Sequence, residues 1–119
     1  MALVLWARVI PPKRVCEEFS LAYELEGAQK AVDLLAKYYG IKEMKVIVDG
    51  RKVGNGNEAC YYGYVAYFKK TGLNKRNILH EFYHHLVYVY DWNMKEFEEE
   101  KKAHWYSKAI TKNMLEKVL

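Results

Sequence analysis

The sequence predicts an α+β fold in a single domain that covers residues 1–119. Apolar residues recur at helical spacing in three separate segments, and short runs of β-branched and aromatic residues lie between the first and the second of these segments. Strands that follow one another beside consecutive helices are typical of α+β proteins rather than of sheets with alternating helices. With 119 residues, of which 51% are hydrophobic, the chain can bury one core.

The first expected element is a long amphipathic helix from about Val15 to Tyr39. Gly40 follows as a C-cap residue, because glycine readily adopts the left-handed conformation that ends helices. The apolar residues that define this helix are Ala28, Ala31, Val32, Leu35 and Tyr38. Residues 1–10, which precede the Pro11-Pro12 break, are interpreted as a first strand or an ordered arm.

The same N-terminal residues indicate the cellular compartment in which we expect the protein. They are too few to span a membrane, and no basic residue precedes the apolar stretch as in a signal peptide. We therefore expect a cytoplasmic protein with no membrane partner.

The middle of the chain predicts a small mixed or antiparallel sheet. Residues 45–50 form a β-branched run that ends in a turn signal, and residues 51–58 read as a loop or hairpin tip. Residues 59–68 are rich in Tyr and Val and predict strand structure. Within them Gly63 marks either a bulge or a break into two short strands.

Two helices are expected in the last third of the chain. Asn74 is a suitable N-cap for a helix that runs to about Tyr90. Residues 91–93 make a tight connection, and a final helix runs from about Met94 to near the C-terminus.

The first of these two helices carries the motif H-E-x-x-H over residues 80–84. Residues four apart lie on the same face of a helix, so His80 and His84 can bind one Zn²⁺ together. Glu81 lies beside them and can take a proton from a metal-activated water. A helix whose histidines are only solvated or hydrogen-bonded is the alternative explanation.

A catalytic zinc site usually has three protein ligands, and the acidic start of the last helix offers candidates for the third. If the two helices form an antiparallel hairpin, Glu99 and Glu100 lie level with His84, at about 1.5 Å of rise per residue. Glu96 lies nearer to the connection. All three glutamates lie close to the apolar face that the helix turns toward the core, so their direction on the helix does not identify which one is the ligand.

The motif together with Glu100-Lys101-Lys102-Ala103-His104 resembles the gluzincin metallopeptidases, whose third ligand opens an E-x-x-A-D or similar stretch. The resemblance covers roughly residues 25–110. It is greatest to the minigluzincins, small soluble archaeal relatives of membrane-embedded prenyl-protein proteases, and the chain is also similar to proteases that cleave phage-type repressors. It implies a minimal zincin-like fold with an N-terminal backing helix, a small sheet, the H-E-x-x-H helix and a glutamate helix. It further implies zinc ligation by His80, His84 and Glu100, with Glu81 as the general base.

One position departs from the family pattern. His104 stands where many relatives have an aspartate that orients a zinc-binding histidine. His104 could fill that role as a hydrogen-bond donor, or it could be a spare ligand. His85 is interpreted as a surface histidine or as a neighbour of the ligands. Four tyrosines are weighed as oxyanion stabilisers, although core packing is the simpler role for each: Tyr61, Tyr62, Tyr83 and Tyr106.

The sequence thus predicts a zinc-dependent peptidase that acts on a peptide or protein substrate. The strand near residues 64–68 is expected to form the rim of the cleft and to pair with extended substrate. The alternative is a catalytically silent metal-binding module with a regulatory or protein-binding role. The net charge of +4 is scattered among glutamates, so no nucleic-acid partner is expected.

The C-terminal residues 111–119 keep apolar side chains to the last position. They either finish the last helix or dock, against their own core or in the cleft of a neighbouring molecule. Resemblance to the minigluzincins, which are latent and self-associating, favours docking. We therefore expect a homo-oligomer with little activity as isolated.

Overall fold

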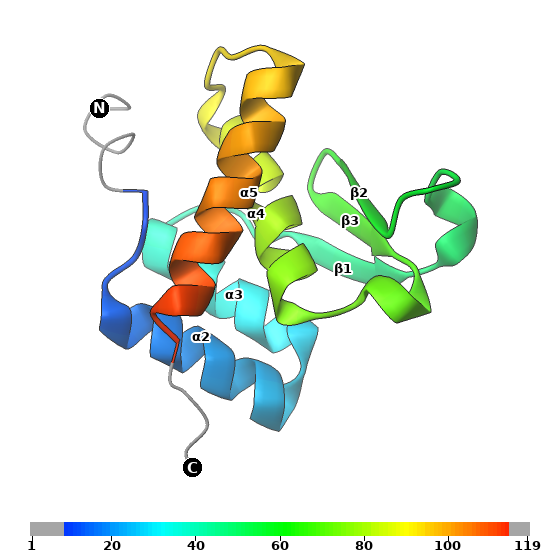
Figure 1. Cartoon of the computed structure of the whole chain (residues 1–119). Helices are drawn as coiled ribbons and strands as arrows, with labels where there is room; N and C mark the ends of the chain where they lie inside the picture. The colour runs from blue at the N-terminus through cyan, green and yellow to red at the C-terminus, as the bar shows by residue number, and fades with distance from the viewer. Residues whose placement is uncertain (1–8, 115–119) are drawn as a thin grey trace.

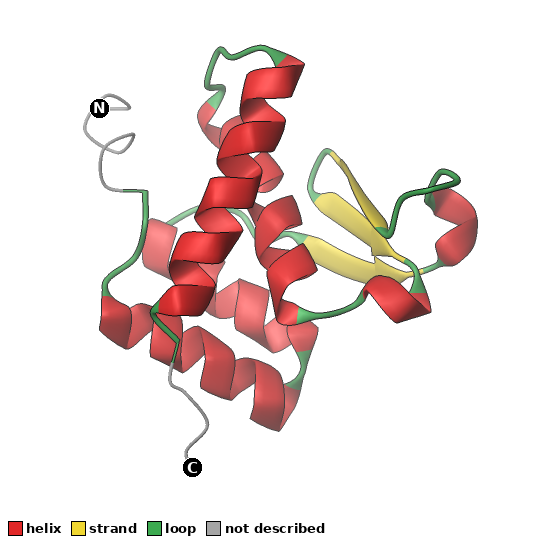
Figure 2. Ribbon diagram, in the orientation of Figure 1, coloured by secondary structure: helices red, strands yellow, loops and turns green. Residues whose placement is uncertain are grey.

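The structure, a computed structural model, describes residues 9–114 and has an α+β architecture (Figures 1 and 2). The α-helices in this range are α2 (Lys13–Glu26), α3 (Ala28–Tyr39), α4 (Lys75–Tyr90) and α5 (Glu96–Lys112). The strands are β1 (Lys45–Val48), β2 (Ala59–Tyr62) and β3 (Val65–Phe68). Two short 3-10 helices, η1 (Gly50–Lys52) and η2 (Lys70–Gly72), connect them. The expected N-terminal strand or arm, apart from residues 9 and 10, lies outside the described residues, as does the end of the C-terminal segment.

The predicted long helix over residues 15–39 is wrong, because the chain divides into α2 and α3 at Gly27. The φ angle of Gly27 is +99°, which a right-handed helix does not accept. Its N–H donates to the carbonyls of Ala22 and Tyr23 and so closes the last turn of α2. The expected cap at Gly40 is confirmed, with φ of 71° in the left-handed region. The two helices pack against each other and lie beneath α4 and α5 in the view of Figure 1.

The sheet is mixed and has the order β1-β3-β2. β1 runs parallel to β3, and β2 runs antiparallel to it. Of the two alternatives at Gly63, a bulge or a break into two strands, the break is confirmed. Gly63 and Tyr64 both have positive φ, 31° and 70°, and turn the chain between β2 and β3. Because β3 is hydrogen-bonded on both sides, it cannot pair with an added chain. The prediction that the strand near residues 64–68 forms the rim and pairs with substrate is therefore wrong. The edge strands are β1 and β2, and of these β2 contributes residues to the cleft beside α4.

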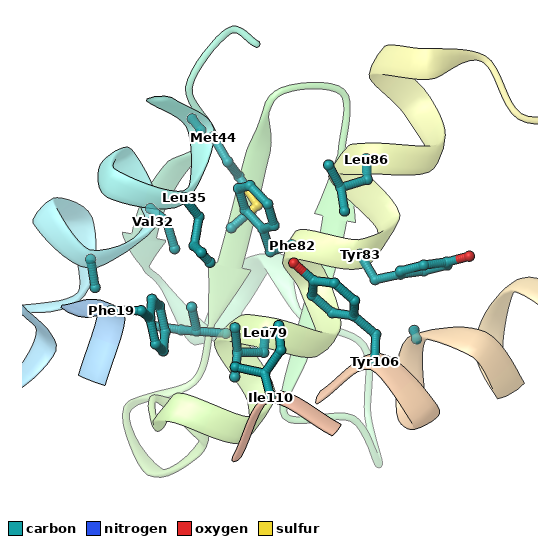
Figure 3. Close-up of a cluster of buried hydrophobic side chains, with 14 of the residues drawn as sticks. Phe19, Val32, Leu35, Met44, Leu79, Phe82, Tyr83, Leu86, Tyr106 and Ile110 are labelled. Carbon is teal, nitrogen blue, oxygen red and sulfur yellow. The ribbon is translucent and has the colours of Figure 1, made fainter. Parts of the chain in front are cut away.

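Helix α4 lies between α5 and the sheet and contributes to the core on more than one side (Figure 3). Leu79, Phe82 and Leu86 have no exposed surface. They belong to a cluster that also contains Phe19, Val32, Leu35, Met44, Tyr83, Tyr106 and Ile110. Interiors are close-packed, so a helix buried in this way has a fixed orientation. The direction in which α4 presents its remaining side chains is fixed with it.

Helices α4 and α5 form the expected antiparallel hairpin. The Asn74 side chain accepts a hydrogen bond from the Asn77 N–H at 2.8 Å, which confirms the predicted N-cap. Asp91, with φ of 56°, ends α4 in the left-handed conformation. Ala103 of α5 is fully buried, and α5 packs along α4. Among the described residues no helix is both long and apolar enough to cross a bilayer.

Candidate metal site

His80, His84 and Glu100 converge between α4 and α5. The Nε2 atom of His80 lies 3.0 Å from Oε1 of Glu100, and Nε2 of His84 lies 2.9 Å from Oε2 of the same carboxylate. One potential donor atom from each of the three residues lies within 4.8 Å of the others. The hairpin therefore brings together the three residues that the sequence predicted as metal ligands.

The donor atoms lie close enough together to hold a single metal ion. Ligands at about 2.0–2.2 Å from a tetrahedral ion lie roughly 3.3–3.6 Å from one another. The two nitrogen–oxygen distances here involve different oxygens of Glu100 and are shorter than this, as expected for hydrogen bonds. Two imidazoles and a carboxylate suit several first-row metals, so the donor set does not select one. The group could hold a metal ion, and the three residues leave further coordination positions open toward the cleft.

The electrostatic environment of His80 favours its neutral form. Burial lowers the pKa of His80, and the nearby His84 lowers it further, while Glu100 acts in the opposite direction. A neutral imidazole has a lone pair to offer a metal ion, whereas an imidazolium has none. The surroundings of His80 therefore reduce the competition between a proton and a metal.

Glu81 lies in the same cleft and is 7% exposed. Burial raises its pKa to about 7; Glu100 adds to this rise, and His84 opposes it. Within the described residues the Glu81 carboxyl has no ion pair and no hydrogen bond. It is thus a buried carboxyl that gains and loses its proton near neutral pH, beside a group able to bind a metal.

The cleft has a volume of about 580 Å³ and is lined by α4, the start of α5 and the segment that leads into β2. Its carboxylates far outnumber its cations, since no lysine or arginine lines it. The lining residues are Asn57, Glu58, Ala59, Cys60, Tyr61, Asn77, His80, Glu81, His84, Glu96, Glu99 and Glu100. The cleft therefore presents a negative surface along the edge of β2.

His85 is buried rather than a surface residue, and it points away from the three converging side chains. Its Nε2–H donates to the carbonyl of Lys42 at 2.7 Å, because a carbonyl can only accept. Its Nδ1 then accepts from the Tyr61 hydroxyl at 2.7 Å. Burial lowers the pKa of His85, in agreement with a neutral ring. His85 thus ties α4 to β2 and to the loop before β1.

Of the four tyrosines weighed as oxyanion stabilisers, only Tyr61 lines the cleft. Its hydroxyl is engaged, since it donates to His85 and accepts from the Tyr64 N–H at 2.7 Å. Tyr62 is 65% exposed, whereas Tyr83 and Tyr106 lie in the core. The arrangement therefore gives none of the four an evident place beside a substrate carbonyl.

Sequence reasoning treated Glu99 only as a possible ligand and missed its actual contact. Oε2 of Glu99 lies 2.5 Å from Nδ1 of His84, on the opposite side of the ring from Glu100. His104, for which this role and that of a spare ligand were the two expectations, is exposed, and its ring makes no hydrogen bond or ion pair within residues 9–114. The alignment of Glu99 with His84 across the hairpin was the signal that could have identified this contact.

No protein-family model, no curated protein and no solved structure matches the chain. The resemblance to gluzincins therefore stays a prediction that rests on the motif and on the residues of the hairpin.

Proposed function

We propose that the protein is a zinc-dependent peptidase of the gluzincin type, with a minimal zincin-like fold. The observation that carries this proposal is the convergence of His80, His84 and Glu100 beside the buried carboxyl of Glu81. Three protein ligands that leave a position open are typical of catalytic rather than structural zinc sites. A carboxyl whose pKa lies near 7 suits a group that must both accept and release a proton.

Zn²⁺ bound by these three residues would act as a Lewis acid that polarises the scissile carbonyl and makes water acidic. In this proposal Glu81 takes a proton from the attacking water on its carboxylate. It then delivers that proton to the leaving nitrogen, so the carboxylate is regenerated. Burial of Glu81 keeps this exchange away from bulk solvent.

The edge strand β2 suggests how a peptide would be held. One side of β2 pairs with β3, and residues 57–61 line the cleft beside His80 and Glu81. An extended peptide could add to such an edge through backbone hydrogen bonds, which require no particular sequence. The negative lining of the cleft favours peptides with lysine or arginine near the cleaved bond.

Metal content tests the site. We expect about one zinc per chain in the purified protein, and little in the His80→Ala, His84→Ala and Glu100→Ala variants. His104→Ala is the matched control on the same helix and should keep its metal. Elemental analysis measures all of these; full metal in His80→Ala and His84→Ala would show that the site lies elsewhere.

Hydrolysis tests the chemistry separately. A fluorogenic peptide library with basic residues should be cleaved in the presence of Zn²⁺ and not in the presence of a chelator. Glu81→Gln should retain zinc and lose cleavage, because Glu81 is not a ligand. Zinc binding without cleavage of any library member would favour the alternative of a silent metal-binding module, and cleavage by Glu81→Gln would refute the assigned mechanism.

A further inference from the structure

The two sides of the His84 ring contact two different carboxylates that follow each other in sequence. Nε2 faces Glu100 at 2.9 Å, and Nδ1 faces Glu99 at 2.5 Å. Consecutive residues on a helix point about 100° apart, so two glutamates can contact opposite sides of one ring only if the ring lies between them. His84 of α4 lies at the same height along the hairpin as Glu99 and Glu100 of α5, so its ring lies between the two carboxylates.

Resting on the proposed function, we propose that Glu99 is the positioning residue of the metal site. In this role it holds the proton of His84 on Nδ1 and thereby directs the Nε2 lone pair at the metal. A histidine that binds a metal through one nitrogen usually donates its other N–H to a carboxylate or carbonyl, which fixes the ring and its tautomer. Glu99 supplies that carboxylate here, from the residue that precedes the ligand Glu100.

The surroundings of Glu99 suit this role. Its side chain is 23% exposed, compared with 57% for Glu100, so water screens its contact with His84 less. Within residues 9–114 it has no lysine or arginine partner that would compete for the carboxylate. No such partner therefore draws the Glu99 carboxylate away from the ring.

The second histidine of the motif lacks such a partner. The Nε2 atom of His80 contacts Glu100, but in the described part of the chain no hydrogen bond reaches its Nδ1. His104 does not replace Glu99, because it is exposed and, within the described residues, its ring makes no hydrogen bond to either histidine. Of the two motif histidines, only His84 is therefore held in orientation by a carboxylate that is not a ligand. We expect removal of Glu99 to lower metal affinity more than removal of any other carboxylate that is not a ligand.

The test compares Glu99→Ala, Glu99→Gln and the control Glu98→Gln, whose parent residue pairs with Lys102 on the same helix. Zinc affinity is measured by competition with a chelator of known affinity. We expect a loss of about 10–100-fold for Glu99→Ala, a smaller loss for Glu99→Gln, which keeps an acceptor oxygen, and no change for Glu98→Gln. Unchanged affinity in Glu99→Ala would overturn the proposal. Loss of all binding in Glu99→Ala, with binding retained in Glu100→Ala, would make Glu99 a ligand and would overturn it equally.

A second measurement does not depend on the metal. Long-range ¹H–¹⁵N NMR of the metal-free Glu100→Ala protein at pH 8.5 reports which ring nitrogen of His84 carries the proton once the carboxylate that faces Nε2 is gone. We expect the proton on Nδ1 in Glu100→Ala and a loss of this preference in the Glu99→Ala/Glu100→Ala double variant. If the wild type binds no zinc, the proposed function fails while this measurement still decides whether Glu99 orients the ring. A proton on Nε2 in Glu100→Ala would refute the role.

Discussion

Replacing Glu81 with glutamine should stabilise the metal-free protein at neutral pH while removing the group that we propose as the general base. Burial holds the pKa of Glu81 at about 7, compared with 4.5 in a solvated carboxyl. At about 1.4 kcal/mol for each tenfold change in acidity, this rise corresponds to about 3 kcal/mol. That free energy is the cost of ionising a carboxyl that is 7% exposed.

The direction in which the free energy of unfolding changes with pH follows from the number of protons bound by the folded and unfolded states. Above about pH 4.5 the unfolded chain releases the proton of Glu81, while the folded protein keeps it until the pH reaches about 7. The folded state binds more protons in this window, so the free energy of unfolding falls as the pH rises from 4.5 to 7. Glutamine cannot ionise. The stability of Glu81→Gln relative to the wild type should therefore grow from near zero at pH 4.5 to about 3 kcal/mol at pH 8.

Urea unfolding, followed by circular dichroism in the presence of a chelator, measures this difference at each pH. The chelator is essential, because a bound divalent cation favours the ionised carboxylate and would reduce the effect. Glu98→Gln provides the control, since it makes the same substitution at a side chain that is 45% exposed on the neighbouring helix. If the free energies of unfolding of the wild type and Glu81→Gln changed in parallel with pH, the reasoning would be refuted.

Two further substitutions test the supports of the cleft. Gly72→Ala should lower the free energy of unfolding by about 1–3 kcal/mol, because the added Cβ would lie 2.6 Å from both Cβ and the backbone oxygen of Glu58. Gly54→Ala, whose Cβ would meet nothing nearer than 3.5 Å, is its control, and equal stability of the two variants would contradict the predicted clash. Tyr61→Phe should cost about 1–3 kcal/mol in urea unfolding, because it leaves the buried Nδ1 of His85 without a donor. Unchanged stability in that variant would mean that another donor, such as water, reaches the ring.

The parts of the site that the sequence predicted depend on local geometry. The cap at Asn74 and the spacing of His80 and His84 follow from the periodicity of one helix. The level alignment of Glu100 required only a short connection between two antiparallel helices. The choice of Glu100 over its neighbour came from the resemblance, and the distances in the hairpin agree with it.

The predictions that were wrong depend on contacts between distant residues, which a pattern along the sequence does not encode. A glycine inside a helix costs only about 1 kcal/mol, so the apolar periodicity gave no reason to end the helix at Gly27. The division at Gly27 allows α3 to pack back against α2, and this tertiary contact is not visible in the periodicity. Similarly, three short strands do not reveal which one is central, because pairing is not local. His85 is expected at the surface or beside the ligands, because the sequence does not show that Tyr61 of β2 and the loop before β1 cover this side of α4.

The high tyrosine content, 11 residues in 119, has a structural explanation in how the helices are joined. A small domain buries a limited apolar area, and a tyrosine adds a large ring together with a hydroxyl that can bond across elements. The Tyr39 hydroxyl bonds to that of Tyr106 at 2.8 Å and so links α3 to α5. The Tyr90 hydroxyl donates to the carbonyl of Tyr39 at 3.3 Å, which links α4 to the end of α3. Tyr61 connects α4 to β2 through His85. Each of these bonds ties one of the two helices that carry the candidate ligands to another part of the fold. Through Tyr39, both helices of the hairpin are hydrogen-bonded to the end of α3, so the hairpin that carries the candidate ligands is anchored to the rest of the fold.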